Sequence, residues 1–449
     1  MKRVIVLGAG LAGLSASLGL VDAGCDVTLL EARPHAGGRA FSFTDRISGE
    51  EIDNGQHVLM GCYVATLRYV ERIGTGALIR RLHGLSLAFR HANGESARLG
   101  AGALPGSLGM VQALLRYRLL SLRERLGIVR TMASLRFFSS ERAAALHEVD
   151  CRTWLMSLGQ SERAMECFWT PVVLATLNSS PATASAGYLY TVLRTIFFSG
   201  KDAADMLLPE VGLSKLLVRS AEERLVERGA RVALHQTAEC LEISGRNTIA
   251  VRLKGGEMLS ADAIVSAVAP WSLSRLLPDV TEFDTLRRTL ALFEPSPILS
   301  VHVWLARDPS IPVMTGALGT AVQWLFPKGR DADGRWRVSC TISASDALQD
   351  KHPDDMRALL AHELPLLIPG LSAQDILRIL PVHERRATFL PSTGIDPHRP
   401  LPRTEIPGLY LAGDWTATSL PATIEGAILS GEAAARAVQQ DFSLIENSR

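Results

Sequence analysis

The segment from Arg3 to Leu14 constrains the fold of this chain more strongly than any other part of the sequence. It begins with a short apolar run, Val4–Leu7, which is followed by Gly8, Gly10 and Gly13. Such a run is typical of a buried parallel strand. Glycines at this spacing permit a tight turn, close approach of the backbone to a pyrophosphate, and close packing of the next helix on the sheet. The pattern predicts a strand–turn–helix unit that binds a dinucleotide.

The residues that follow complete this unit. A helix is expected over roughly 12–23, with Gly24 as its stop signal, and its N-terminal amides would face the phosphates. The pattern of Cys25–Leu30 predicts the second strand. Glu31 ends that strand 18 positions after Gly13, where a carboxylate can accept both ribose hydroxyls.

Two further segments near the N-terminus are expected to contact the cofactor. Gly37 and Gly38 permit close backbone approach, and the forked donors of Arg39 can neutralise a diphosphate. A solvated surface arginine is the alternative. Polar residues then crowd around a glycine in Asp53–His57, between apolar flanks, which favours a loop beside a ligand over a generic turn.

Composition limits the class of protein. The 449 residues suffice for two or three domains, and the net charge of +1 provides no basic field for nucleic acid. The six cysteines are scattered without metal-site spacing, which predicts buried thiols, no metal and a cytoplasmic location. The hydrophobic content is 47%, yet no apolar run spans a membrane, and glycines interrupt the stretch that imitates a signal peptide. We therefore expect a large apolar pocket, a membrane-contacting face, or both.

The order of patterns along the chain predicts an α/β protein with a discontinuous, Rossmann-like cofactor domain. A mixed α+β substrate domain and a helical part complete this prediction. Strand patterns recur at 229–234, 239–243, 248–253 and 261–267, and later at 298–305 and 337–343, with a helix at 354–367. The expected divisions are 1–80, 206–270 and 391–449 for the cofactor domain, 81–205 for the helical part, and 271–390 for the substrate domain.

The segment from Leu104 to Ser139 has helical periodicity and carries interspersed arginines. The pattern has two interpretations of about equal weight. One is an ordinary pair of surface helices with solvated arginines, and the other is an amphipathic segment that lies on anionic lipid. The second would place the protein at the inner face of the membrane. The following stretch, Cys151–Phe198, is also expected to be mainly helical.

The C-terminal segment selects between two kinds of dinucleotide. Gly408–Asp414 has the pattern of a strand that ends in Gly-Asp, Pro421 occupies the position of a first helical residue, and a helix follows over 424–438. A diphosphate would repel Asp414, so its expected partner is a sugar-alcohol hydroxyl. The positive end of the helix would stabilise the negative charge of a reduced flavin ring. Because nicotinamide offers neither group, this segment favours FAD over NAD.

These motifs together resemble the superfamily of FAD-dependent amine oxidases and phytoene desaturases. Within it, Asp53–His57 and Leu411–Thr416 are most similar to the hydroxysqualene dehydroxylases, also called squalene-associated FAD-dependent desaturases. Leu420–Ala427 and Arg385–Phe389 extend the resemblance, which covers essentially the full length. Amine oxidases of the superfamily carry an aromatic residue where this chain has Thr423, a departure that favours an uncharged hydrocarbon substrate.

The resemblance implies reductive removal of the hydroxyl of hydroxysqualene, which yields squalene for hopanoid synthesis. The substrate would be a long apolar isoprenoid, and an electron donor that the sequence does not identify would reduce the flavin. Protonation of the leaving oxygen requires a general acid. His57, Asp53 and Glu425 are the candidates, and His57 has the most suitable ordinary pKa, although it could instead hold the flavin or the loop.

The expected FAD contacts come from all three parts of the cofactor domain. They are Gly8, Gly10, Leu11, Ala12, Gly13, Glu31, Ala32, Arg33, Gly38, Arg39, Gly55, Gln56, His57, Ala238, Gly413, Asp414, Pro421, Ala422 and Thr423.

Three other functions compete with dehydroxylation. A carotenoid-type desaturase or isomerase would share the fold, the flavin and the apolar pocket. Escort proteins for prenylated partners use this fold without flavin, but intact cofactor motifs argue against that interpretation. An NAD-dependent dehydrogenase would leave the C-terminal Gly413-Asp414 motif unexplained.

Overall fold

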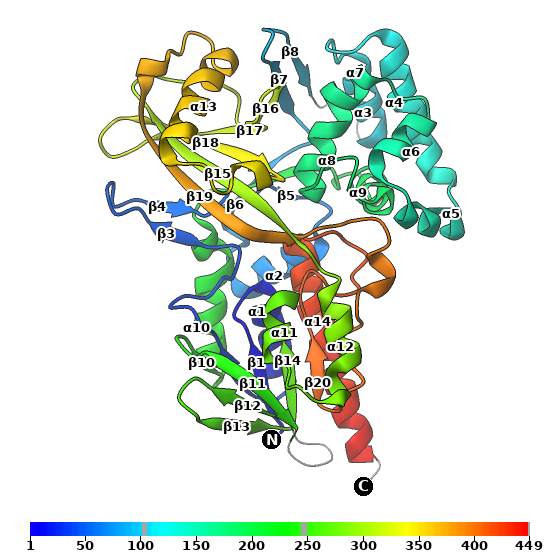
Figure 1. Cartoon of the computed structure of the whole chain (residues 1–449), viewed down its shortest axis with the longest axis vertical. Helices are drawn as coiled ribbons and strands as arrows, with labels where there is room; N and C mark the ends of the chain where they lie inside the picture. The colour runs from blue at the N-terminus through cyan, green and yellow to red at the C-terminus, as the bar shows by residue number, and fades with distance from the viewer. Residues whose placement is uncertain (101–105, 244–248, 448–449) are drawn as a thin grey trace.

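The computed structural model describes residues 1–100, 106–243 and 249–447. Figure 1 shows a parallel-sheet domain that contains both termini, with a second, larger sheet and a group of helices above it. The fold is thus α/β, and it contains the parallel-sheet domain, the mixed α+β part and the helical part that the sequence predicts.

Three separate parts of the chain build the parallel sheet of the cofactor domain. Its order is β10-β2-β1-β14-β20, and every neighbouring pair is parallel. Apolar side chains from β1 and β14 are fully buried, as expected for a sheet that is covered on both faces. The strands are β1 (Arg3–Leu7), β2 (Asp26–Leu30), β10 (Arg231–Ala233), β14 (Ala263–Ser266) and β20 (Leu409–Leu411).

Helices from the two ends of the chain pack against each other beside this sheet. These are α1 (Leu11–Asp22) and α14 (Ile424–Asn447). A Cβ on Gly431 would stand 2.2 Å from the carbonyl oxygen of Ala12, so α14 approaches α1 at backbone distance. The Ser15 hydroxyl donates to the carbonyl of Ile428 at 2.9 Å. Small residues in both helices therefore hold the N- and C-terminal parts of the domain together.

The second sheet has seven strands in the order β19-β15-β18-β17-β16-β7-β8. Its outer face is apolar and packs on α13 (Pro353–Leu367) through Leu299, Val301 and Cys340. The strands are β7 (Leu87–His91), β8 (Ser96–Leu99), β15 (Pro295–Leu305), β16 (Thr315–Leu318), β17 (Trp324–Arg330), β18 (Trp336–Ser343) and β19 (Ile376–Phe389).

The helical part begins later than predicted. The expectation of a helical region from residue 81 is wrong for its first part, because β7 and β8 form a hairpin that joins the seven-stranded sheet. Asn93-Gly94, a strong hairpin turn signal, connects these two strands. Leu104 lies outside the described residues. The helices are α3 (Gly106–Leu115), α4 (Leu122–Ser134), α5 (Ser140–Ala145), α6 (Cys151–Ser157), α7 (Glu162–Ala164), α8 (Thr170–Leu177) and α9 (Ala186–Phe198), with a π-helical turn at Met165–Trp169.

Smaller elements connect these layers. Two short sheets pair β3 with β4 and β9 with both β5 and β6, and an antiparallel sheet β11-β12-β13 lies beside the cofactor domain. No helix among the described ranges is long and apolar enough to cross a bilayer. The remaining bounds are β3 (Ser42–Thr44), β4 (Glu51–Asp53), β5 (Leu59–Met60), β6 (Ile79–Leu82), β9 (Met206–Pro209), β11 (Ala238–Ile243), β12 (Ile249–Leu253), β13 (Met258–Ala261), α2 (Val64–Ile73), α10 (Ser220–Glu227), α11 (Pro270–Leu276) and α12 (Asp284–Ala291).

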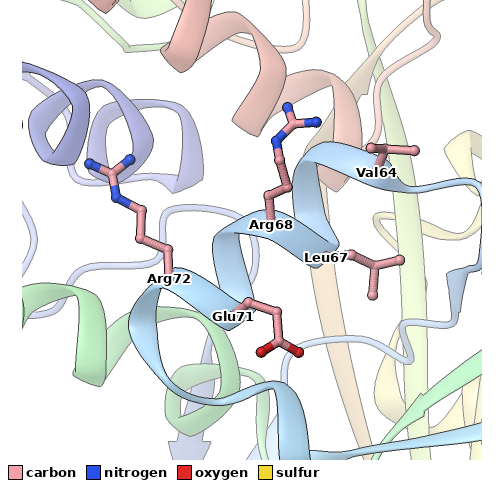
Figure 2. Close-up of a pocket in the computed structure, with 5 residues that line it drawn as sticks. All are labelled: Val64, Leu67, Arg68, Glu71 and Arg72. Carbon is pink, nitrogen blue, oxygen red and sulfur yellow. The ribbon is translucent and has the colours of Figure 1, made fainter.

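Helix α2 is held in place by charges at both of its ends. The buried carboxylate of Glu425 accepts hydrogen bonds of 2.8 Å from the backbone N–H groups of Ala65 and Thr66. A third bond of 2.8 Å comes from the Thr66 hydroxyl. In Figure 2, Arg68 and Arg72 extend toward neighbouring helices, where they pair with Glu432 and Asp22. Glu425 therefore supplies the capping that α2 lacks from its own residues.

An open groove of about 610 Å³ runs along the outside of α2 and is lined by Val64, Leu67, Arg68, Glu71 and Arg72 (Figure 2). None of the residues predicted to contact FAD lines this groove.

Glu425→Gln should lower the free energy of unfolding by about 2 kcal/mol, because charge-assisted bonds to buried amides are lost. Chemical denaturation with circular dichroism measures this change. Glu432→Gln is the matched control, since Glu432 lies on the same helix but forms a partly exposed ion pair that should contribute less than about 1 kcal/mol. Equal effects of the two substitutions would contradict the capping role.

Candidate functional site: a dinucleotide cradle beneath a polar sheet face

The glycine-rich turn forms a cradle at the N-terminus of α1. A Cβ on Gly13 would stand 1.9 Å from the carbonyl oxygen of Gly8, so only glycine fits there. Gly38 has φ of +61°, and its Cβ position lies 3.0 Å from the Cα of Gly10. No side chain caps the helix at Gly10, which leaves its first amides available to a phosphate. This arrangement fits the diphosphate of a dinucleotide.

Glu31 lies buried at the end of β2, beside this cradle. Its carboxylate accepts hydrogen bonds of 2.9 Å from the backbone N–H groups of Ala9 and Arg33. The two bonds fix the orientation of the carboxylate. Each oxygen retains a further lone pair for a ribose hydroxyl, so the predicted role of Glu31 is compatible with this geometry.

Arg39 and Asp414 form an ion pair between the N-terminal and C-terminal parts of the domain. The Arg39 guanidinium lies 2.6 Å from the buried Asp414 carboxylate and also donates to the carbonyl of Ala387. Burial opposes the charge of Arg39, but attraction to Asp414 outweighs it and raises the arginine pKa. The sequence predicts separate partners for these residues, a diphosphate and a ribityl hydroxyl. In the structure they contact each other.

Arg399, which no sequence motif indicates, organises the loop after Asp414. Its side chain is fully buried and donates to the carbonyls of Asp414 and Leu420 at 2.8 and 2.7 Å. It also donates to the Thr418 hydroxyl at 2.9 Å, and its guanidinium lies 5.2 Å from the centre of the Phe389 ring. No local pattern could reveal this role, because the partners are mostly backbone groups distant in the sequence.

The start of α14 differs from the prediction. Pro421 was expected as the first helical residue, but the helix begins at Ile424. The Thr423 hydroxyl accepts a 3.0 Å hydrogen bond from the N–H of Gly426, as an N-cap does. With Pro421 as the first helical residue the N-cap would be Leu420, which is a much poorer cap than Thr423, and this difference favours the later start. Ala422 packs against the main apolar cluster, as does Ala238 on β11.

The loop Asp53–His57 lies against the inner, polar face of the seven-stranded sheet. His302 Nε2 donates to the carbonyl of Asp53 at 3.1 Å. The hydroxyl of Ser300 stands 3.2 Å from the position of a Cβ on Gly55. The Asp53 carboxylate accepts from the Ser42 hydroxyl at 2.7 Å and from the N–H of Leu213 at 2.8 Å. The sheet therefore positions this loop above the cofactor domain.

The geometry of His57 changes its predicted role. Its Nδ1 lies 3.0 Å from the carbonyl of Gly55, which can only accept, so Nδ1 carries the proton and Nε2 offers a lone pair. Burial lowers the pKa of His57, and the positive charge of Lys328 lowers it further. At neutral pH the ring is therefore uncharged and presents an acceptor rather than an acid.

Glu425 is the catalytic candidate that the geometry does not support. It is 7% exposed, and its carboxylate receives three hydrogen bonds from the N-terminus of α2. All three donors belong to α2, so both carboxylate oxygens are engaged in holding that helix. Its position supports a structural role instead.

Two further residues near the loop, His302 and Lys328, were also missed. Burial and the charge of Lys328 lower the pKa of His302 to about 4, so this ring is neutral as well. Burial likewise lowers the pKa of Lys328, and the neighbouring Arg337 adds to the effect. Alternation in β15, where Ser300 and His302 interrupt an apolar strand at every second residue, is the signal that could have indicated His302.

Comparison with known proteins assigns the family. The sequence profile described as "Flavin containing amine oxidoreductase" matches residues 11–439. The chain belongs to this family. It is therefore an FAD-dependent oxidoreductase, with FAD as its cofactor, and the cradle at Gly13 and Glu31 fits that cofactor.

The relatives include enzymes that act on isoprenoids. "Hydroxysqualene dehydroxylase" of Rhodopseudomonas palustris is 33% identical over 97% of each chain. "15-cis-phytoene desaturase, chloroplastic/chromoplastic" of Glycine max is 24% identical over 99% of this chain and 80% of its own length. Among solved structures, a triple mutant of putrescine oxidase has a TM-score of 0.75 with 16% identity and covers 98% of this chain and 99% of its own. At that identity the likeness concerns the fold alone.

The low pKa of His302 predicts acid sensitivity. The unfolded imidazole titrates near 6.5 and the folded one near 4, so the unfolded state binds the proton more tightly between these values. Stability should therefore fall as the pH drops through this window, by up to about 3 kcal/mol, and should not change above it on account of this group.

Urea denaturation of the wild type and of His302→Gln at pH 7 and pH 5 measures this contribution. Gln keeps a donor to the Asp53 carbonyl but does not titrate, so the variant should lose less stability on acidification than the wild type. An identical loss in both proteins would contradict the assignment.

Proposed function

We propose that this enzyme removes the hydroxyl group of hydroxysqualene reductively to give squalene. The observation that carries the proposal is the full-length likeness to proteins named hydroxysqualene dehydroxylase, which reaches 33% identity. Two further bacterial relatives carry the same name, at 31% and 26% identity. The phytoene desaturases match at 24% or less, which makes desaturation the second candidate.

The site supplies the surroundings that such a reaction needs. Bound FAD, once reduced, supplies a hydride. The cradle at Gly13 would hold its diphosphate and Glu31 its ribose, while Arg39 and Asp414 lie where the two ends of the domain meet. Within the loop Asp53–His57, neutral His57 would offer Nε2 to the hydroxyl proton of an alcohol and so orient its oxygen.

Departure of that oxygen as water consumes one proton, taken up from solvent, and leaves an allylic cation. The cation would accept the hydride to give squalene, and it survives only where bulk water is excluded. The main apolar cluster provides such surroundings. It includes Phe89, Tyr117, Phe168, Trp324 and Phe326, which come from the seven-stranded sheet and the helical part. Apolar side chains of this kind suit a long isoprenoid chain.

Amine oxidation fits the site less well. Thr423 stands where the resembling amine oxidases carry an aromatic residue, and its hydroxyl is engaged in capping α14. A flavin-free escort function would not need the cradle at Gly13 or the buried Glu31.

The proposal predicts that purified enzyme with chemically reduced FAD converts hydroxysqualene to squalene under anaerobic conditions. Gas chromatography with mass spectrometry identifies the product, and oxidised enzyme is the control, because it has no hydride to transfer. Absence of squalene from enzyme with bound FAD would contradict dehydroxylation. Conversion of phytoene under oxidising conditions would then favour a desaturase.

We also propose that the outer face of α4 and the turn that follows it rests on an anionic membrane surface. The exposed stripe is defined by Leu122 and Leu126, which are one helical turn apart on α4, and by Phe137 in the turn after it; they are 62%, 52% and 85% exposed. The buried side chains of α4, Ile128 and Met132, face the core instead. Exposed arginines surround the stripe, namely Arg116, Arg118, Arg123, Arg130 and Arg136. Apolar side chains among cationic ones are typical of helices that lie in a lipid interface.

The combined substitutions Leu122→Ser, Leu126→Ser and Phe137→Ser should weaken binding to phosphatidylglycerol vesicles about tenfold or more, since three apolar side chains no longer enter the interface. Vesicle flotation measures this binding. Val226→Ser with Leu401→Ser, two exposed apolar residues outside the stripe, is the control and should bind like the wild type. Equal binding by all three proteins, or no preference for anionic over neutral vesicles, would contradict the proposal.

A further inference from the structure

The inner face of the seven-stranded sheet carries two rows of side chains beside the loop Asp53–His57. Strand register places Ser300, Thr341 and Trp324 opposite one another in the first row. The second row contains His302, Ser339 and Phe326. Directly opposed residues share a face and have Cβ atoms about 5 Å apart. The six side chains therefore form one continuous patch.

Three polar atoms in this patch have no hydrogen-bond partner within the described part of the chain. They are Trp324 Nε1, Ser339 Oγ and Thr341 Oγ1, all of them buried atoms. Trp324 and Ser339 are 5% and 0% exposed. An unsatisfied buried polar group costs about 1–3 kcal/mol, so three of them on adjacent strands indicate a site that awaits a polar ligand.

The next row of the same face is covered by the chain itself. Trp304 and Arg337 stand opposite each other in that row. The guanidinium of Arg378 lies 4.1 Å from the centre of the Trp304 ring, and Arg337 pairs with Glu50 at 3.0 Å. Trp304 Nε1 and Arg337 Nε likewise have no hydrogen-bond partner among the described residues, but Arg378 and Glu50 cover this row, whereas the loop Asp53–His57 borders the patch.

The borders of the patch define what the ligand must be. On one side, Ser300 Oγ and His57 Cε1 lie 3.2 and 3.7 Å from the Cβ position of Gly55, in the loop expected beside the flavin. On the other side, Trp324 packs edge-on against Phe89 at 5.7 Å between ring centres, within the main apolar cluster. The ligand therefore combines one polar group with an extended apolar body.

The polar atoms favour a neutral oxygen over a charged group. An indole N–H only donates, whereas the two hydroxyls donate or accept, and none of the three is anionic, so an ammonium group would find no counter-charge. The acceptor Nε2 of His57, on the cofactor side of the patch, complements these donors.

We propose that Trp324 Nε1, Ser339 Oγ and Thr341 Oγ1 form the binding site for the hydroxyl oxygen of a long apolar alcohol. The proposal rests on the dehydroxylase function and names the residues that distinguish the alcohol from a hydrocarbon. Hydrogen-bond donors to the oxygen withdraw electron density from it and thereby weaken the C–O bond. This is the bond that breaks when the protonated oxygen leaves as water.

The test compares the binding of hydroxysqualene and squalene to oxidised holoenzyme, followed by changes in flavin absorbance. Ser339→Ala and Thr341→Val each remove one polar atom while the shape of the side chain is nearly kept. Each should raise the dissociation constant of hydroxysqualene about threefold to tenfold, as expected for one lost hydrogen bond, and leave that of squalene unchanged. Trp324→Phe removes the N–H together with part of the ring, so both constants should rise, and that of hydroxysqualene should rise more. Cys340→Ala is the matched control, because Cys340 lies between Ser339 and Thr341 on the opposite, apolar face and should not alter the ratio of the two constants.

Equal weakening of both ligands by the three variants would assign these residues to packing and overturn the proposal. Variants that bind both ligands like the wild type would overturn it as well. Since oxidised enzyme does not turn over, the ratio is readable even if the dehydroxylation assay fails. A wild type that binds hydroxysqualene no more tightly than squalene would disprove the hydroxyl site, whereas failure of turnover alone would disprove only the proposed reaction.

Discussion

The packing of α1 against α14 is the contact on which the rest of the structure depends. Gly431 approaches the backbone of α1 so closely that any side chain at that position would collide with the carbonyl of Ala12. This contact brings the C-terminal strand β20 and the loop after it to the same domain as the glycine-rich turn. The Arg39–Asp414 ion pair and the capping of α2 by Glu425 both follow from it. The chain leaves this closed domain twice, between β2 and β10 and again between β14 and β20.

The seven-stranded sheet has two different faces, and this difference separates stability from function. Its outer face is a continuous apolar layer against α13, which includes Leu299, Val301 and Val338. Residues along each strand point alternately to the outer and the inner face. The inner face bears Ser300, His302 and Ser339, next to the loop beside the cofactor domain. Period-two alternation thus lets the same strands build a core on one side and a polar site on the other. Substitutions in the apolar outer face should therefore affect stability more than the choice between ligands.

Three carboxylates around the site act as acceptors for backbone amides. Glu31 holds the glycine-rich turn, Asp53 holds the segment at Leu213, and Glu425 holds α2. Each of them bonds to a backbone amide at least 22 positions away in the sequence. The neutral rings of His57 and His302 complete a site in which hydrogen-bonding geometry, rather than opposite charges, orients an uncharged substrate.

The sequence alone determined the cofactor domain, because glycine spacing and strand periodicity are local consequences of backbone sterics. Gly8, Gly13 and Glu31 were predictable for this reason, as was the pairing of three separate segments into one parallel sheet. The hairpin of β7 and β8 is also locally encoded, by the turn signal Asn93-Gly94, although the prediction of a helical region from residue 81 does not include it. Tertiary structure decided the rest. The partners of Arg39, Arg399 and Glu425 lie far away in the sequence, and the proton position on His57 depends on the carbonyl that its loop presents. Long-range contacts set such roles, and no pattern of neighbouring residues contains them.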